Sequence, residues 1–291
     1  MAEVHRDSFV AGQYFLGVTG MAVMREIMRR PSNGRPRIDE MHEIVANYST
    51  FPNDLEIAVV EHEVESGYTA WAPIYDGPNP AIELEAPIVQ AMVDECDGTH
   101  ALDAACGTGR HAGYLAGAGF ETIGIDATPA MLDVARESFP AVDFRVGRLE
   151  ALPVDDASCD VVTSALAVCH APDLDAVFDE FARVLRPGGT LILSDPHPSS
   201  VQFGGAAVFR DRDADPTAGM TMPFVPNLHH PIHTYVNAAV ANGLEIVECR
   251  EPVYDSSVFS SNPAYGVLPD AVEQAFGGLP FIVVWRMRKP G

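Results

Sequence analysis

A glycine-containing loop with two nearby aspartates is the part of this sequence best suited to chemistry. The loop lies in the stretch Asp103-Ala-Ala-Cys-Gly-Thr-Gly109, between an expected strand and an expected helix. Such a loop presents backbone N–H groups and a helix N-terminus to a ligand. Asp126 ends the next expected strand, 19 residues after Gly107, where a carboxylate can bind the two hydroxyls of a ribose. These residues therefore predict a ligand that contains a nucleoside.

The charge of Asp103 helps to distinguish between the possible nucleoside ligands. With Ala112 the loop also satisfies G-x-G-x-x-A, the fingerprint of dinucleotide sites, so a nicotinamide oxidoreductase is one alternative. A carboxylate beneath the loop would repel a pyrophosphate but attract an α-ammonium group. A ligand with a ribose, an ammonium and no phosphate is S-adenosylmethionine. The purely structural alternative is a tight turn at Gly107 and Gly109, with Asp103 as a helix cap.

Five sequence blocks in order resemble the class I S-adenosylmethionine-dependent methyltransferases, in particular the small-molecule group that includes ubiquinone/menaquinone-type methyltransferases. The blocks are Asp103–Gly109, Gly124–Met131, Ala151–Pro153, Cys159–Val162 and Arg183–Gly189. The resemblance spans residues 99–195, and the segment 241–252 is similar to the closing part of the same group. It implies an α/β, Rossmann-like fold with a seven-stranded, mostly parallel sheet whose last strand is antiparallel. It also implies S-adenosyl-L-methionine as the cofactor.

The loop pattern and the resemblance together indicate a set of cofactor-binding residues. The expected set is Tyr75, Asp103, Ala105, Cys106, Gly107, Gly109, Arg110, Asp126, Ala127, Met131, Leu149, Glu150 and Ala165. Two positions depart from the family pattern. Ala105 stands where glycine is usual, and Arg148 stands where the family often has an aspartate that accepts from adenine. Because arginine cannot accept a hydrogen bond, adenine would be bound by Glu150, by the Leu149 backbone or by water.

Aromatic residues before the loop and an arginine after it are also expected near the cofactor. Tyr68, Trp71 and Tyr75 lie where this family often folds an N-terminal helix over the cofactor. Trp71 is equally suited to core packing, whereas the two tyrosines have hydroxyl groups to place. Arg110 is expected to bind the cofactor carboxylate, because a helix N-terminus disfavours an exposed cation.

Two histidines are the candidate catalytic residues. His170 and His197 follow successive strands at the carboxyl edge of the sheet, where ligands bind in open α/β sheets. Transfer of a methyl group to oxygen or carbon usually needs a base, whereas a neutral amine needs none. Helix capping or packing is the alternative role for each histidine. No metal site is expected, since His229, His230 and His233 have no acid or cysteine at ligand spacing.

Hydrophobic periodicity divides the chain into a helical part and an alternating part. Residues 1–95 are expected to form a helical N-terminal cap region. Residues 96–291 are expected to form the S-adenosylmethionine-binding methyltransferase domain, because strands and helices alternate there. Residues 198–230 have no clear period, and we expect a lid insertion at about this position. The strands expected in the second part are 100–105, 121–125, 142–146, 159–167, 190–194, 244–250 and 281–288, with Pro187-Gly-Gly189 as the stop before 190–194.

Charge and cysteine content limit the partners and the compartment. The 291 residues carry 41 acidic and 18 basic side chains, a net charge of −23, which disfavours nucleic acid as a partner. No apolar run approaches the roughly 18–20 residues of a membrane-spanning helix, so no membrane partner is expected. Five cysteines form no C-x-x-C pair, which favours reduced thiols in a cytoplasm.

We therefore expect a cytoplasmic enzyme that transfers a methyl group in line to oxygen, nitrogen or carbon of a small-molecule substrate. The alternative is an S-adenosylmethionine-binding protein without methyl transfer, either a sensor or a non-methylating enzyme. The oligomeric state stays open, a homodimer included.

Overall fold

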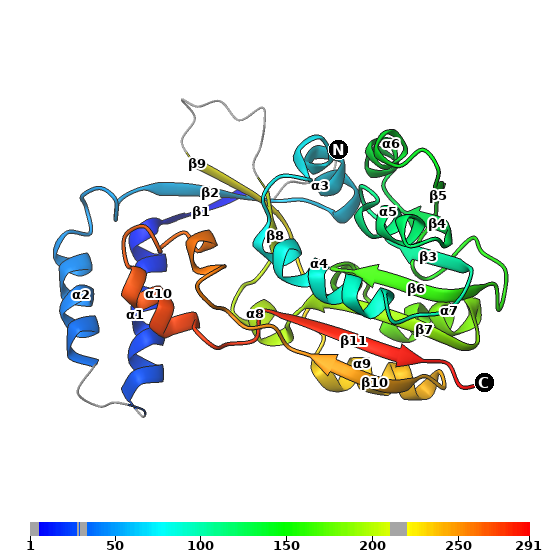
Figure 1. Cartoon of the computed structure of the whole chain (residues 1–291). Helices are drawn as coiled ribbons and strands as arrows, with labels where there is room; N and C mark the ends of the chain where they lie inside the picture. Colours follow the sequence, from blue (N-terminus) through cyan, green and yellow to red (C-terminus); the bar gives the residue numbers. More distant parts are fainter. Residues whose placement is uncertain (1–5, 28, 30–33, 210–219) are drawn as a thin grey trace. The chain divides into compact units, whose positions relative to one another are not determined.

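The computed structural model describes residues 6–27, 29, 34–209 and 220–291, which belong to two compact units (Figure 1). The larger unit comprises Glu63–Ala207, Val225–Pro252 and Phe281–Gly291. The smaller unit comprises Met1–His62, Val208–Phe224 and Val253–Pro280. This division differs from the expected boundary at residue 95.

The difference in the boundary has a packing cause. Helix α4 (Pro80–Val93) packs on strands of the larger unit's sheet and buries Val89, Met92 and Val93 there. A helix with such an apolar stripe is stable only where that stripe is covered. The segment from residue 63 onward therefore belongs to the larger unit.

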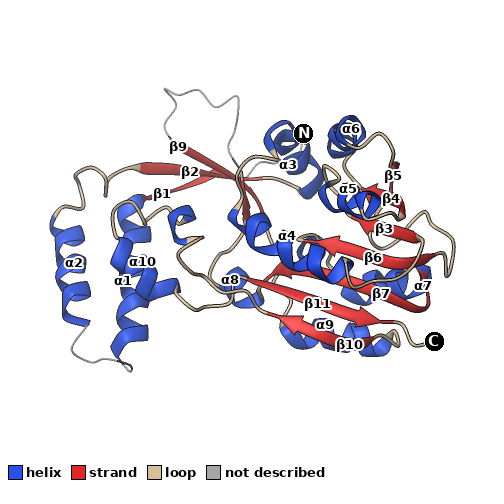
Figure 2. Ribbon diagram, in the orientation of Figure 1, coloured by secondary structure: helices blue, strands red, loops and turns tan. Residues whose placement is uncertain are grey.

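A seven-stranded sheet forms the centre of the larger unit (Figure 2). Its strands, in spatial order, are β10 (Glu245–Arg250), β11 (Ile282–Arg288), β7 (Leu185–Pro196), β6 (Cys159–Ala165), β3 (His100–Ala104), β4 (Glu121–Asp126) and β5 (Asp143–Val146). The last strand, β11, pairs antiparallel with β7 and with β10, and the strand pairs from β7 to β5 are parallel. The Rossmann-like sheet with an antiparallel last strand is thus confirmed.

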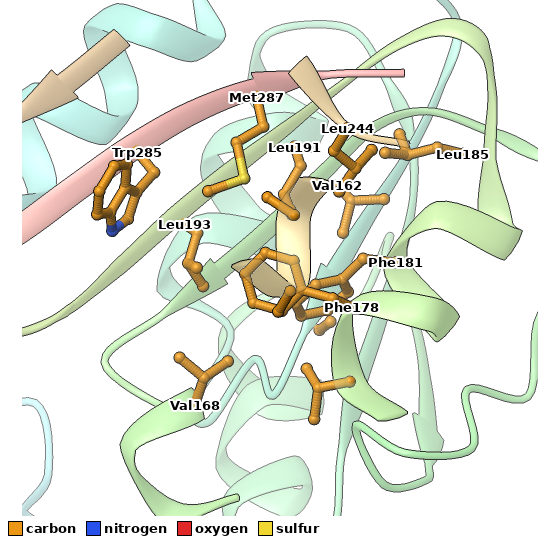
Figure 3. Packing of buried hydrophobic residues seen from close by; sticks show 14 of the residues in the cluster. Val162, Val168, Phe178, Phe181, Leu185, Leu191, Leu193, Leu244, Trp285 and Met287 are labelled. Atoms are coloured by element: carbon orange, nitrogen blue, oxygen red, sulfur yellow. The ribbon is translucent and has the colours of Figure 1, made fainter. Parts of the chain in front are cut away.

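Both faces of the central strands β6 and β7 are largely buried, whereas β10 at the edge of the sheet is mostly exposed. In β7, Leu191 and Leu193 belong to one core cluster and Ile192 to another, as the two-residue period of a strand requires. Figure 3 shows Phe178 and Phe181 packed in the first of these clusters. The helices of this unit are α3 (Val64–Trp71), α4, α5 (Arg110–Gly117), α6 (Pro129–Ser138), α7 (Leu174–Val184), α8 (Pro198–Gln202) and α9 (Ile232–Ala241).

The expected stop at Pro187-Gly-Gly189 is wrong. Strand β7 begins at Leu185 and passes through this segment. The partner of Cys159 is Leu185 but the partner of Val161 is Thr190, so the extra residues form an irregularity within the ladder. Gly188 has a φ of 85°, a left-handed conformation that glycine adopts without strain. Proline and glycine therefore mark a bulge here rather than the end of an element.

The smaller unit contains a sheet that the sequence analysis missed. Its strands, in spatial order, are β1 (Arg6–Val10), β2 (Glu56–Glu61), β9 (Met220–Val225) and the two-residue β8 (Ala207–Val208). Its helices are α1 (Ala11–Ile27), α2 (Gly34–Ala46) and α10 (Pro269–Phe276). Residues 1–95 are not helical throughout, because they also contain β1 and β2, and β2 pairs with β9, whose sequence lies more than 150 residues away. Residues 210–219 of the expected lid lie outside the described residues, and the role as a lid stays a prediction.

Within the described residues, none of the helices has both the length and the apolar character that crossing a membrane requires.

Candidate functional site

A pocket of about 750 Å³, open at its mouth, lies at the carboxyl ends of β3, β4, β5 and β6 in the larger unit. The chain leaves β3 for β4 on one side and reaches β6 on the other, so the pocket is at the switch point where open α/β sheets bind ligands. The predicted residues that line it are Tyr75, Ala105, Gly107, Asp126, Ala127, Met131, Leu149, Glu150, Ala165 and His170.

The two glycines of the loop have different roles. Gly107 has a φ of 54°, and a Cβ there would meet only the Tyr75 ring, at 3.9 Å, so this backbone can be approached closely from the pocket. Gly109 has a φ of 86°, and a Cβ there would lie 2.9 Å from Phe144. Gly109 therefore serves the packing of the loop on β5, and Gly107 serves the pocket.

Ala105, one of the two departures from the family pattern, has a φ of 59°. This is the left-handed region, which costs a residue with a Cβ roughly 1–2 kcal/mol. The conformation explains why glycine is usual at this position. The loop keeps its course because the Cys106 N–H donates to the Ile125 carbonyl oxygen at 2.8 Å.

Asp126 connects the loop to the pocket. One carboxylate oxygen accepts from the Gly107 N–H and the other from the Thr128 N–H, each at 2.8 Å. The Thr128 hydroxyl and the Ala127 N–H are further donors to this carboxylate, which borders the pocket. Burial raises the pKa of Asp126, although the N–H donors of Thr128 and Gly107 oppose this effect.

Asp103 lies beneath the loop, but it does not line the pocket. Its two oxygens accept from the Ala112 N–H and the Thr163 hydroxyl, each at 2.8 Å, and the residue is 2% exposed. The carboxylate thus braces the start of α5 against β6. Its expected contact with the cofactor ammonium stays a prediction. Cys106 and Gly109 also lie outside the pocket lining.

Comparison with known proteins identifies this arrangement. A family model described as "Methyltransferase domain" matches residues 102–193. A Mycolicibacterium smegmatis protein named as a probable S-adenosylmethionine-dependent methyltransferase is 37% identical over 110 residues, which are 38% of this chain and 43% of that protein. A malonyl-[acyl-carrier protein] O-methyltransferase of Serratia marcescens is 38% identical over 152 residues, which are 51% of this chain and 58% of that protein. Residues 102–193 are therefore similar to the S-adenosylmethionine-dependent methyltransferases.

The fold agrees with this assignment over more of the chain. The crystal structure of an S-adenosylmethionine-dependent methyltransferase from Mesorhizobium loti matches with a TM-score of 0.54 at 21% sequence identity, covering 73% of this chain and 99% of that one. The chain spans less than two thirds of the length of the two curated relatives named above. The Mycolicibacterium smegmatis relative is named as S-adenosylmethionine-dependent, which favours this cofactor over a dinucleotide for the loop.

Arg110 is engaged inside the methyltransferase domain and does not line the pocket. Its Nη1 lies 2.8 Å from Oε2 of Glu85, a carboxylate that is fully buried. The other oxygen, Oε1, lies 2.9 Å from His111 Nε2 and accepts from the Ser194 hydroxyl at 2.9 Å. Burial alone would raise the pKa of Glu85, but His111 and Arg110 outweigh it and lower this pKa. The sequence analysis missed Glu85, because its partners are 25 or more residues away.

The segment after β5 brings the expected adenine-binding residues to the pocket. Gly147, Arg148, Leu149 and Glu150 all line it. Arg148 Nε lies 3.6 Å from Glu150 Oε2, and the Arg148 side chain is 71% exposed. This chain lacks the acid that the methyltransferase pattern often has at position 148, but it has an acid, Glu150, two residues later. Recognition of adenine by Glu150 or the Leu149 backbone stays a prediction.

The two candidate catalytic histidines have different surroundings. His197 lies outside the pocket lining; its Nδ1 accepts from the Ser199 N–H at the start of α8, and its Nε2 donates to Glu251 at 2.8 Å. This is the capping role that the sequence analysis left as the alternative. His170 lines the pocket, with Nδ1 3.1 Å from the Pro226 carbonyl oxygen and Nε2 2.8 Å from the Tyr68 hydroxyl.

Aromatic rings from α3 and the turn after it form one wall of the pocket. Tyr68 lies 5.7 Å from Trp71 in a stacked arrangement, and Trp71 lies 4.9 Å from Tyr75, measured between ring centroids. Tyr68 and Tyr75 line the pocket. Tyr68 was expected near the cofactor, but its pairing with His170, 102 residues away in sequence, was not expected.

His229, His230 and His233 lie outside the pocket lining. His230 Nε2 donates to the Ala171 carbonyl oxygen at 2.9 Å, and the Leu228 N–H donates to the Cys169 carbonyl oxygen at 2.7 Å. The segment before α9 thus holds the turn that carries His170. Among the described residues, no group of three or more His, Cys, Asp or Glu side chains is placed to hold a metal.

A buried acid supports the same turn. Asp195, at the end of β7, is fully buried, accepts from the Cys169 N–H at 3.2 Å and accepts from the Tyr235 hydroxyl at 2.5 Å. Burial raises the pKa of Asp195 to about 7, although the donors oppose this effect.

The raised pKa of Asp195 makes stability depend on pH. The folded protein binds this proton more tightly than the unfolded chain, so this contribution to stability is complete at low pH and is lost as pH rises toward 7. We expect the free energy of unfolding to fall by about 2 kcal/mol between pH 5 and 7 because of this group, since one pKa unit is about 1.4 kcal/mol. Urea unfolding of Asp195→Asn at both pH values should show a correspondingly smaller loss.

Asp160 provides the control for that measurement. Its pKa is lowered to about 2, because burial is outweighed by donors from Thr99, His100 and Arg186. Its contribution is therefore constant above pH 5, and Asp160→Asn should destabilise the protein equally at pH 5 and 7. The same pH slope in Asp195→Asn as in the wild type would contradict the assignment.

Proposed function

We propose that this protein transfers the methyl group of S-adenosylmethionine to a small molecule. The observation that carries the proposal is that Gly107, Asp126 and His170 converge on one pocket. A backbone that allows close approach and an acid that borders the pocket suit a nucleoside with an amino-acid tail. A partly buried histidine suits an acceptor that has to lose a proton.

The proposed roles of the chain's residues are mainly those of positioning, which is the main contribution an enzyme makes to an in-line displacement. The bound cofactor would supply a methyl group on a sulfonium, a leaving group that needs no further activation. Asp126 would hold the ribose, and Leu149 and Glu150 would flank the adenine. The small residues Ala105 and Ala165 would leave room for the methionine part.

The names of relatives support a small acceptor. One relative is a malonyl-[acyl-carrier protein] O-methyltransferase, and another is a demethylmenaquinone methyltransferase of Chlorobaculum tepidum, 40% identical over 96 residues. The net charge of −23 disfavours a polynucleotide acceptor. The five cysteines are all free thiols, which supports a reducing cytoplasm as the compartment.

Binding and turnover test the proposal together. We expect the purified protein to bind S-adenosylhomocysteine but not NAD in calorimetric titrations. With S-adenosylmethionine and a panel of acceptors (a malonyl thioester, a catechol, a naphthoquinol and a primary amine), we expect S-adenosylhomocysteine to form with at least one class. Binding without product for any class would favour the sensor alternative, and absence of binding would contradict the proposal.

A further inference from the structure

We infer that Tyr68 and His170 form a proton relay that serves a hydroxyl acceptor of phenol or enol type. The inference rests on the proposed function and names the substrate class and the residue that faces the substrate. Tyr68 comes from α3, and His170 comes from the turn after β6. Both line the same pocket, next to Ala165, Leu166 and Ala167 at the end of β6.

The hydrogen bonds of His170 define the direction of the relay. The Pro226 carbonyl oxygen can only accept, so Nδ1 of His170, 3.1 Å away, carries the proton. In the neutral imidazole Nε2 then has a lone pair, and the Tyr68 hydroxyl donates to it at 2.8 Å. The lone pairs of the Tyr68 oxygen remain free to accept from a hydroxyl group in the pocket.

The surroundings keep both groups in the protonation states that the relay needs. Burial lowers the pKa of His170, so the imidazole is neutral at pH 7. Burial raises the pKa of Tyr68 well above its usual value, with Tyr75, Cys169, Asp126 and Asp195 adding to the effect. Tyrosine thus keeps its proton until a base takes it.

The proposed step couples two proton transfers to the transfer of the methyl group. The acceptor O–H gives its proton to the Tyr68 oxygen while the Tyr68 proton moves to His170 Nε2. The acceptor oxygen forms a bond to the methyl carbon of S-adenosylmethionine, and the carbon–sulfur bond breaks with its electron pair on sulfur, leaving S-adenosylhomocysteine. The imidazolium then releases its proton to water.

The lowered pKa of the His170 imidazole determines which class of acceptor it can deprotonate. An imidazole with a lowered pKa takes protons efficiently only from groups of comparable acidity. A phenol or enol meets this condition far better than an aliphatic alcohol. The aromatic wall of Tyr68 and Tyr75 and the apolar side chains of Val64 and Leu166 also suit a flat, apolar acceptor.

The first test needs no substrate. In the NMR titration of the full-length protein we expect His170 to titrate below its usual pKa, and in Tyr68→Phe we expect this pKa to rise, because the neutral form loses its donor. Tyr114→Phe is the matched control, since Tyr114 donates to Asp94 at the surface. An unchanged His170 titration in Tyr68→Phe would overturn the relay.

The second test uses catechol and a primary amine as probe acceptors. We expect Tyr68→Phe and His170→Ala to lower kcat for catechol by roughly 100-fold or more, with the affinity for S-adenosylhomocysteine changed less than about twofold. Added imidazole should restore part of the activity of His170→Ala, a rescue that a packing role does not allow. If the protein binds S-adenosylmethionine and methylates only the amine, the relay is refuted while the proposed function stands.

Discussion

Replacing Asp126 by alanine lowers the affinity for S-adenosylhomocysteine by roughly 100-fold. A hydrogen bond to a charged group contributes about 1.5–3 kcal/mol, and a factor of 100 corresponds to about 2.8 kcal/mol. Asp126 would accept from the ribose while it also holds the Gly107 N–H at 2.8 Å. The change therefore removes a ligand contact and loosens the loop. Calorimetric titration of S-adenosylhomocysteine measures the effect.

Two further variants separate the charge of Asp126 from its shape. Asp126→Asn keeps one acceptor oxygen, so we expect an affinity between those of the alanine variant and the wild type. Asp133→Ala is the matched control, because this acid of α6 is 76% exposed and pairs with Arg136 of the same helix. Equal affinities of Asp126→Ala and Asp133→Ala would show that Asp126 does not bind the cofactor.

Replacing Glu85 by alanine lowers the free energy of unfolding of the larger unit by about 3–5 kcal/mol. Glu85 is fully buried and pairs with Arg110 and His111. Removing one partner of a buried ion pair leaves the other charge without compensation, which is the costly case. Ser194 also loses its acceptor. Both tryptophans, Trp71 and Trp285, lie in the larger unit, so their fluorescence during urea unfolding follows this unit.

Glu83→Ala is the control for this measurement. Glu83 lies in the first turn of the same helix, α4, and is exposed. Glu83 stabilises the helix through its interaction with the helix dipole, by about 0.3–1 kcal/mol. Glu85→Gln keeps the shape of the side chain without its charge. Its loss of unfolding free energy should lie between those of Glu85→Ala and Glu83→Ala. A loss in Glu85→Ala no larger than in Glu83→Ala would refute the role of the buried cluster.

The helices and strands of the larger unit could be predicted because their causes are local. The strand Cys159–Ala165 is buried along most of its length, and strands of this kind alternate with amphipathic helices. The loop could also be predicted, since a left-handed turn before a helix favours Gly107 and Gly109 whatever surrounds it. Asp126 could be predicted from the same pattern, because the number of residues between the loop and the end of β4 is typical of such sites.

The residues that only the tertiary structure revealed owe their roles to partners far away in the sequence. The sequence contains both Tyr68 and His170, but it does not show that α3 places the hydroxyl 2.8 Å from the imidazole. It likewise does not show that His197 is engaged by Glu251.

The sequence by itself determined the sheet, the glycine loop and the class of cofactor, because hydrophobic period and backbone conformation act over a few residues. The tertiary structure decided which aspartate, tyrosine and histidine face the pocket, and it paired β2 with β9 in the smaller unit. Side-chain hydrogen bonds and strand pairing depend on distances between atoms, which local preferences do not specify.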